Sequence, residues 1–196
     1  MSEGHHPDGL SLDPMCNHYR ADPVWREAMG EFSDIKIPVF KDRGVPNSVK
    51  AHVYPGRDGE ILMVDEGELA NAAAHWRFVP FHWKGSLKEW AKPSKPGAVR
   101  GLSCNNARGE TADTTAMFRE AAKSGRCLIP THAFYEYAKE PGPDGKKIEY
   151  EFAPPAGGVL THDQCAAWLD PANPVSRFLE VSPAGTFTVE RAQKAA

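Results

Sequence analysis

The sequence is poor in cysteine, and the few cysteines it has do not form a metal-binding pattern. None of the four lies in a C-x-x-C pair or combines with histidines at the spacing of a zinc site. We therefore expect no metal and no other cofactor. The opening stretch, MSEGHHPDGLSLDP, has neither the basic start nor the apolar core of a signal peptide. Free thiols in a reducing cytoplasm are the simplest interpretation of the four, which are Cys16, Cys104, Cys127 and Cys165.

Long apolar runs and an excess of positive charge are absent as well. No stretch approaches the roughly 20 apolar residues that cross a bilayer, so we expect no membrane contact. The formal net charge of −3 excludes a generally basic nucleic-acid coat. Any contact with DNA must then come from a local basic patch. A chain of 196 residues is long enough for one sizeable core, and we expect a monomer.

The sequence does contain many turn residues between short elements. Glycine and proline occur 17 times each. Apolar runs at 36–40 and 60–65 predict strands, alternation at 186–190 predicts another, and 139–147 reads as an exposed hairpin turn. The pattern favours an α+β fold with a mixed or antiparallel, barrel-like sheet and few helices.

Two helices are predicted from their end signals. Asp113 is placed to cap the first, which Gly125 would close. Thr161 and Gln164 stand three apart, as in a capping box, at the start of the second. Residues 1–14 are rich in glycine, proline, histidine and aspartate without periodicity, which predicts a disordered or non-mature extension. We expect residues 15–196 to form a single domain.

The stretch MCNHYR, residues 15–20, places Cys16 directly after a possible initiator methionine. Within a core this cysteine is one more small apolar residue in a strand. At a true N-terminus it carries an α-amine and a thiol on one residue. The stretch alone leaves both interpretations open.

Two further stretches belong with it, NNARGET at 105–111 and RCLIPTHAFYEY at 126–137. Together the three resemble the motifs of the SRAP family, the SOS-response-associated peptidases, which are also described as abasic-site processing proteins. NARGET matches the family's Asn-Ala-Arg-x-Glu-Thr at every fixed position. FYEY differs from its Phe-Tyr-Glu-Trp only at Tyr137. The three motifs stand in the family's order, so the match is specific, although it weakens towards the C-terminus.

The resemblance implies a covalent link to abasic sites in single-stranded DNA, and the residues give this link a coherent chemistry. A ring-opened abasic site presents an aldehyde, which an α-amine attacks to give a Schiff base. A thiol on the same residue then closes a five-membered thiazolidine, at the high effective concentration of tethered reactants. Cys16 must therefore become the first residue. Either translation starts at Met15, which we favour, or residues 1–15 are cleaved.

Three polar residues are predicted to assist Cys16. Glu136 is the expected proton shuttle, since flanking aromatic residues can raise the pKa of its carboxyl group; the alternative is a surface glutamate on an edge strand. By the resemblance, Asn106 orients the amine or the opened sugar, and Arg108 meets a phosphate. The alternative for this pair is a polar turn before a helix.

Aromatic residues beside basic ones suggest a groove for single-stranded nucleic acid. The stretch WRFVP aligns with the Trp-Gly-Leu-x-Pro of the family, so Trp76 matches and Arg77 stands in place of glycine. Trp83 is carried over across a poorer alignment. The alternative is that these tryptophans belong to the core.

The sequence also departs from the family. The His-x-Arg-Met-Pro stretch that carries a histidine in other members is not found, and the chain looks shortened near residues 150–156. His162 falls in the first turn of a helix, and His132 has no family precedent. Three hypotheses therefore stand: a cytoplasmic, lyase-like protein of the SOS response that associates with the nucleoid when bound to DNA, a self-processing cysteine peptidase, and a non-catalytic single-stranded DNA-binding module.

Overall fold

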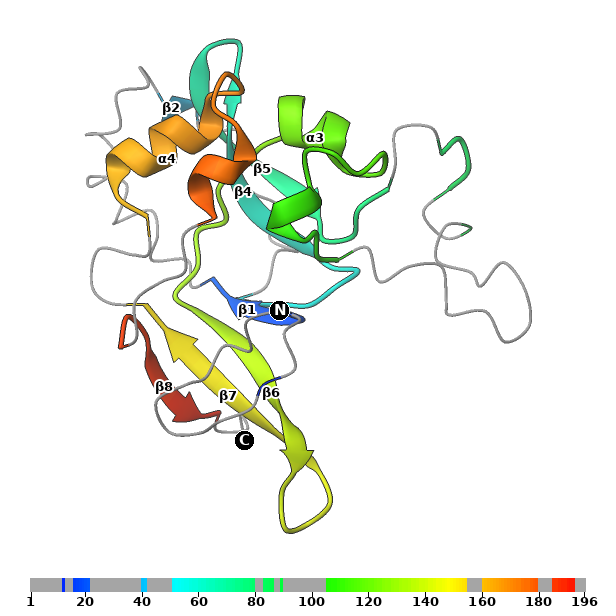
Figure 1. The fold of residues 1–196 in the computed structure, drawn as a ribbon, viewed down its shortest axis with the longest axis vertical. Coiled ribbons are helices and arrows are strands. Elements are labelled where there is room, and N and C mark those ends of the chain that lie inside the picture. The colour runs from blue at the N-terminus through cyan, green and yellow to red at the C-terminus, as the bar shows by residue number, and fades with distance from the viewer. Residues whose placement is uncertain are drawn as a thin grey trace.

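The computed structural model describes residues 12, 16–21, 40–41, 51–79, 83–86, 89, 105–154, 160–179 and 185–192. Over these residues the chain forms two sheets, two α-helices and two short 3-10 helices (Figure 1). The strands are β1 (His18–Arg20), β2 (Phe40–Lys41), β3 (His52–Val53), β4 (Asp58–Asp65), β5 (Glu68–His75), β6 (Ala133–Pro141), β7 (Lys147–Ala153) and β8 (Thr188–Arg191). The helices are η1 (Gly109–Thr111), α3 (Arg119–Ser124), α4 (His162–Leu169) and η2 (Val175–Phe178).

The larger sheet has the strand order β3-β1-β6-β7-β8, and each neighbouring pair is antiparallel. The smaller sheet has the order β2-β5-β4, in which β2 runs parallel to β5. The predicted α+β class with a mixed or antiparallel sheet is confirmed. Over the described residues both sheets are open, with edge strands at each side, so they do not close into the barrel-like form that the turn-rich sequence suggested.

Two tight turns build the hairpins of these sheets. Between β4 and β5, Glu66 and Gly67 both have positive φ angles, of 52° and 83°. Such a pair of angles matches the twist of the flanking strands and makes a two-residue loop possible. Between β6 and β7, Gly145 has a φ of 72°. It lies in a turn that is closed by a hydrogen bond from the N–H of Gly142 to the carbonyl oxygen of Lys146. The hairpin turn predicted at 139–147 is therefore confirmed.

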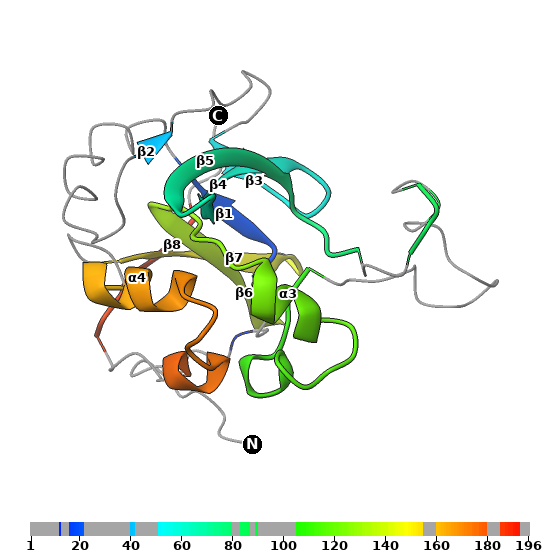
Figure 2. The same cartoon turned by 90° about the horizontal axis from the view of Figure 1, so that it is seen from above.

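The helices pack on one side of the β4–β5 hairpin (Figure 2). Helix α4 begins at the predicted capping box, where the Thr161 and Gln164 side chains each bond the backbone of the other residue. The prediction that Asp113 caps the first helix is wrong. Helix α3 starts at Arg119, and the residues from 112 to 118 form successive turns. The adjacent threonines at 114 and 115 disfavour helix, because β-branched side chains lose freedom there.

The core joins the smaller sheet to the segment that leads into β6. Leu62 is fully buried, in a cluster with Leu69 and Leu169. Its backbone also exchanges two hydrogen bonds with Leu128, of 2.9 Å and 2.8 Å. Leu62 thus ties β4 to the chain that carries the larger sheet. Of residues 1–14, Leu12 is described, and it forms an isolated bridge with Ala138 of β6.

We expect the substitution Leu62→Ala to lower the free energy of unfolding by about 3 kcal/mol, since it removes buried methyl groups from a site with little room to collapse. The matched control is Ile129→Ala, because Ile129 is 48% exposed and lies next to Leu128 in the chain. Urea denaturation followed by circular dichroism measures both. Equal losses for the two variants would contradict this picture of the core.

Candidate active site at Cys16

The strand that follows Cys16 is paired on both edges. In β1, Tyr19 lies opposite Val53 of β3 on one side and Phe134 of β6 on the other. Tyr19 is 6% exposed and approaches β4 so closely that a Cβ at Gly59 would lie 1.9 Å from its hydroxyl oxygen. Cys16 is therefore held at the start of a strand that cannot shift without breaking two ladders.

The thiol of Cys16 is half-buried, and its Sγ donates to the carbonyl oxygen of His18 at 3.7 Å. Burial raises the pKa of the thiol above its usual value. A backbone hydrogen bond at His18 opposes this shift, and the nearby carboxylate of Glu136 adds to it. The thiol is protonated at neutral pH, unlike the thiolates of activated cysteines, which sit in positive surroundings.

Asn106 and Glu136 reach Cys16 from two other segments. The side-chain amide of Asn106 donates to the carbonyl oxygen of Cys16 at 3.0 Å, across 90 positions of sequence. Glu136, in the middle of β6, is close enough to act on the charge of the thiol. The three residues predicted to do chemistry thus come together at the start of β1.

Of the predicted nucleic-acid contacts, Trp76 is linked to the residues around Cys16 by contacts with Tyr19 and Asn105. The indole of Trp76 is half-buried, tilts against Tyr19 with 5.2 Å between ring centroids, and donates to the carbonyl oxygen of Asn105 at 3.1 Å. Trp76 therefore supports the segment that carries Asn106. Arg77 is half-buried beyond β5, and Arg108 is exposed at the start of η1.

Trp83 makes a local contact. Its Nε1 donates to the carbonyl oxygen of Ser86 at 3.3 Å, three residues further on, so this bond does not tie the indole to Cys16. His132 is exposed, and its backbone N–H donates to Arg20. His162 is the first residue of α4, but its side chain lies outside the described part of the structure.

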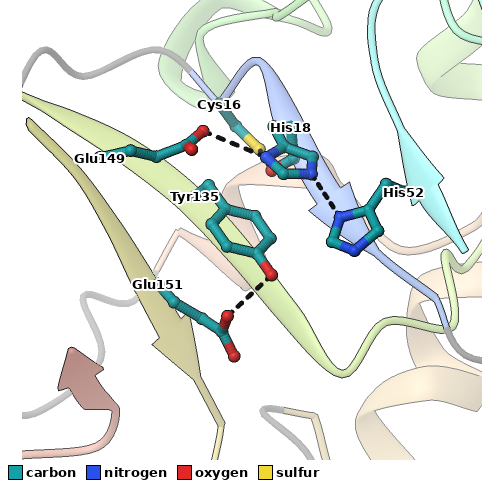
Figure 3. Close-up of polar contacts among 6 residues, drawn as sticks. All are labelled: Cys16, His18, His52, Tyr135, Glu149 and Glu151. Carbon is teal, nitrogen blue, oxygen red and sulfur yellow. Dashed lines mark hydrogen bonds and ion pairs between the residues drawn. The ribbon is translucent and has the colours of Figure 1, made fainter. Parts of the chain in front are cut away.

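A buried histidine beside Cys16 is the main feature that sequence reasoning missed. His18 is 4% exposed, with its ring stacked between Tyr135 at 3.9 Å and Tyr54 at 4.2 Å. Figure 3 shows its two nitrogens engaged, Nδ1 with Glu149 at 3.1 Å and Nε2 with His52 at 2.8 Å. Burial lowers the pKa of His18, and Glu149 partly opposes this shift.

A second polar chain lies next to this histidine on the same face of the sheet. The hydroxyl of Tyr135 donates to Glu151 at 2.8 Å, and Arg20 pairs with the same carboxylate at 3.3 Å. Burial, together with this carboxylate, raises the pKa of Tyr135 to about 12. Alternation of Glu149 and Glu151 along β7 is the sequence signal that could have indicated a polar face here.

Comparison with known proteins agrees with the motifs gathered at this site. Residues 15–162 match the family model described as SOS response associated peptidase (SRAP). The chain belongs to this family. The match spans about three quarters of the sequence and includes Cys16, Asn106 and Glu136.

Two curated proteins resemble this SRAP chain. Both are named abasic site processing protein YoqW, one from Bacillus subtilis (strain 168) and one from Bacillus phage SPbeta. Each is 28% identical over 109 residues, which cover 56% of this chain and 45% of the relative. The match therefore spans less than half the length of these relatives.

A crystal structure of a protein from Bordetella bronchiseptica has a similar fold. It aligns with a TM-score of 0.55 and 19% identity over 91% of this SRAP chain and 100% of the other. Among the residues that the structure describes, no group of three or more His, Cys, Asp or Glu side chains is arranged to hold a metal. Within the same residues, no helix is long and apolar enough to cross a membrane.

We expect the Cys16 thiol to react slowly with iodoacetamide at pH 7, and its rate to keep rising above pH 8.5, because burial and Glu136 oppose ionisation. The substitution Glu136→Gln removes a negative charge near the sulfur, so it should speed alkylation several-fold at pH 8. Peptide mass mapping reports the modification of Cys16 separately from the other cysteines. Glu110→Gln, an exposed change on η1, is the control. A slower reaction in Glu136→Gln would contradict the assigned sign.

Proposed function

We propose that this chain traps abasic sites in single-stranded DNA by a covalent thiazolidine link through Cys16, once Cys16 is the first residue. The observation that carries the proposal is the meeting of Cys16, Asn106 and Glu136 at the start of β1 in a member of the SRAP family. The name of the relatives, abasic site processing protein, supports the choice of substrate.

The state of the thiol favours an amine-first reaction. The α-amine, with an ordinary pKa of about 7.7–8.0, is partly neutral near pH 7, so it can attack the aldehyde carbon of the opened sugar. The carbinolamine that forms loses water to give an imine. This imine is protonated on nitrogen when it forms, and the sulfur then bonds to its carbon as the thiol gives up its proton. The whole sequence releases one water and needs no thiolate at the outset.

Glu136 is proposed as the group that moves the protons. As a carboxylate, Glu136 can first take the proton that the α-ammonium group sheds before it attacks, then donate that proton to the leaving hydroxyl of the carbinolamine, and finally accept the thiol proton. Asn106 holds the Cys16 carbonyl, which fixes the direction in which the new amine points. Both roles depend on position, because the two residues arrive from segments far apart in sequence.

DNA contacts are proposed for the residues around this centre. The exposed Arg108 lies two residues from Asn106 and suits a phosphate that flanks the lesion. Arg77 extends the basic region, while Trp76 and Trp83 offer aromatic surface to neighbouring bases. These roles belong to the single domain of residues 15–196, whose reactive form begins at Cys16 and acts as a monomer. We place its action in the SOS response, in the cytoplasm, and at the nucleoid when it is bound to DNA.

The peptidase alternative receives less support from the geometry. A cysteine peptidase needs a thiolate beside an imidazole that can take its proton. Here burial raises the pKa of the thiol, and His18 has both ring nitrogens engaged with Glu149 and His52. The amine-first reaction fits these surroundings better.

The test is a chain that begins at Cys16, incubated with a single-stranded oligonucleotide that contains one abasic site. We expect an adduct that survives denaturing electrophoresis, and no adduct from the chain that retains residues 1–15. In Cys16→Ala the α-amine remains but the thiol is lost. This variant should give an adduct only when a borohydride reductant traps the imine.

The same assay measures the role of Glu136. Glu136→Gln should slow adduct formation on the order of 100-fold, the usual contribution of a general acid–base group. Glu110→Gln should leave the rate unchanged, and thermal unfolding checks that both variants are folded. A stable adduct from Cys16→Ala without reductant would exclude the thiazolidine, and reversible binding alone would favour the non-catalytic module.

A further inference from the structure

Tyr54, directly after β3, is the exposed end of a stack of three aromatic rings. The ring of Tyr54 lies on that of His18, with 4.2 Å between centroids and 15° between planes. The opposite face of His18 lies on Tyr135, at 3.9 Å and 12°. His18 and Tyr135 are each 4% exposed, whereas Tyr54 is 46% exposed. The outer face of the Tyr54 ring is therefore open to solvent.

Hydrogen bonds hold the two inner rings of this stack in place. The nitrogens of His18 bond Glu149 and His52, and the hydroxyl of Tyr135 donates to a second carboxylate on β7 (Figure 3). A ring that is already supported on one face loses little freedom when a planar ligand stacks on the other. Tyr54 thus presents a preoriented aromatic surface.

Tyr54 also begins a tight turn over residues 54–57. The N–H of Arg57 donates to the carbonyl oxygen of Tyr54 at 3.0 Å. Pro55 and Gly56 stand between them, and Gly56 has a φ of 86°, which are the residues and the angle of a type II turn. Two backbone hydrogen bonds to Trp76, from Gly56 at 2.7 Å and to Arg57 at 2.8 Å, anchor the turn to the end of β5. The turn is therefore a rigid part of the surface.

This turn is connected to the reaction site by two routes. The indole of Trp76 bonds the carbonyl oxygen of Asn105, and the next residue, Asn106, bonds that of Cys16. The second route runs through the ring of His18, which is two residues from Cys16. Two residues of extended chain span roughly 7 Å. A nucleotide next to one held at Cys16 can therefore reach the turn.

Positive charge lies along one part of the turn. Arg57 is exposed, and none of the ion pairs among the residues that the structure describes involves it. The guanidinium of Arg77 lies over Gly56, where a Cβ would be 3.6 Å from Nη2. By contrast, burial and then the nearby carboxylate of Glu149 raise the pKa of the Tyr54 hydroxyl. A phosphate is therefore favoured beside the arginines and disfavoured near that hydroxyl.

We propose that residues 54–57 form a nucleotide subsite, in which the outer face of Tyr54 stacks on the base next to the abasic site and Arg57 contacts the adjoining phosphate. The inference rests on the proposed function and names the part of single-stranded DNA that this turn binds. Aromatic stacking accepts every base, but a purine covers more of the ring than a pyrimidine does. The subsite therefore prefers a purine beside the lesion. Tyr54 and Arg57 bind the strand and take no part in the bond to Cys16.

The test uses a single-stranded oligonucleotide with one tetrahydrofuran residue, an abasic analogue that cannot open to an aldehyde. Fluorescence anisotropy then measures binding by the full chain without a covalent step. We expect Tyr54→Leu to weaken binding about tenfold, because leucine keeps an apolar cover on His18 but offers no aromatic face. Tyr54→Phe keeps the ring and should bind within about twofold of the wild type. Thermal unfolding checks that both variants are folded.

Changes in the probe separate stacking from a merely structural role of Tyr54. In a series of probes, each position around the analogue carries adenine, thymine or no base. At one position next to the analogue, the wild type should bind adenine more tightly than thymine, and thymine more tightly than no base. Tyr54→Leu should bind these three probes alike. If no position distinguishes the two proteins in this way, or if the wild type does not bind the probes, the subsite is excluded.

The salt dependence of binding tests Arg57. Arg57→Ala should reduce the slope of log K against log salt concentration by about 0.7, the contribution of one phosphate contact on a single strand. The matched control is Arg191→Ala, since Arg191 is exposed on β8, at the opposite edge of the sheet from β3. This control should keep the wild-type slope. An unchanged slope in Arg57→Ala would contradict the phosphate contact.

Failure of the subsite and failure of the reaction give different results. If the wild type shows the Tyr54-dependent preference for a purine but forms no adduct with a true abasic site, the reaction at Cys16 fails and the subsite stands. If an adduct forms although Tyr54→Leu binds every probe as the wild type does, the subsite fails and the reaction stands.

Discussion

The short strand β1 is paired on both edges, with β3 and with β6, and the geometry of the site depends on that pairing. Its alternate residues face opposite sides of the larger sheet. Tyr19 points into the core, where it meets Trp76 and fills the space beside Gly59. His18 and Arg20 point to the polar face, where they meet the carboxylates of β7. A slip of one residue would exchange the two faces and bury charge against the core, so the register is strongly specified. Because Cys16 lies two residues before β1, this register also fixes the position of Cys16.

Burying polar side chains on this face of the sheet costs hydration free energy, which hydrogen bonds among the buried groups offset. An imidazole removed from water loses hydration, and an unpaired polar atom in such a place costs about 1–3 kcal/mol. Both nitrogens of His18 have partners, and the hydroxyl of Tyr135 and the guanidinium of Arg20 share one carboxylate. The buried amide of Asn71 likewise donates to Glu60 at 3.0 Å within the β4–β5 hairpin. These buried polar groups are thus paired with partners from other strands, which makes the network sensitive to loss of any one member.

Much of this arrangement could be predicted from the sequence, and the rest depends on contacts between distant residues. The hairpin turn at 139–147 and the capping box follow from local turn and cap chemistry, and these predictions were confirmed. The strand β5, which completes the β4–β5 hairpin, was not predicted. The start of α3 was missed because a single Asp cap signal outweighed two β-branched threonines that favour turns. The approach of Asn106 and Glu136 to Cys16 followed from motif resemblance alone. His18 was not recognised, because its partners lie 34 and 131 positions away in the chain, and no local pattern marks a pair that only strand pairing creates.

A raised thiol pKa is an advantage in the proposed reaction, since it makes the sulfur reactive only after the substrate is bound. A permanent thiolate would be open to oxidation and alkylation between encounters with damaged DNA. In the resting site, burial and Glu136 keep the thiol protonated. Formation of a protonated imine places a positive charge on the nitrogen of the same residue, and a nearby positive charge stabilises a thiolate. Glu136, which opposes ionisation of the thiol at rest, then stabilises the iminium. The Glu136 carboxylate therefore keeps the thiol protonated before the amine attacks. After the attack it stabilises the iminium cation, whose charge favours ionisation of the thiol.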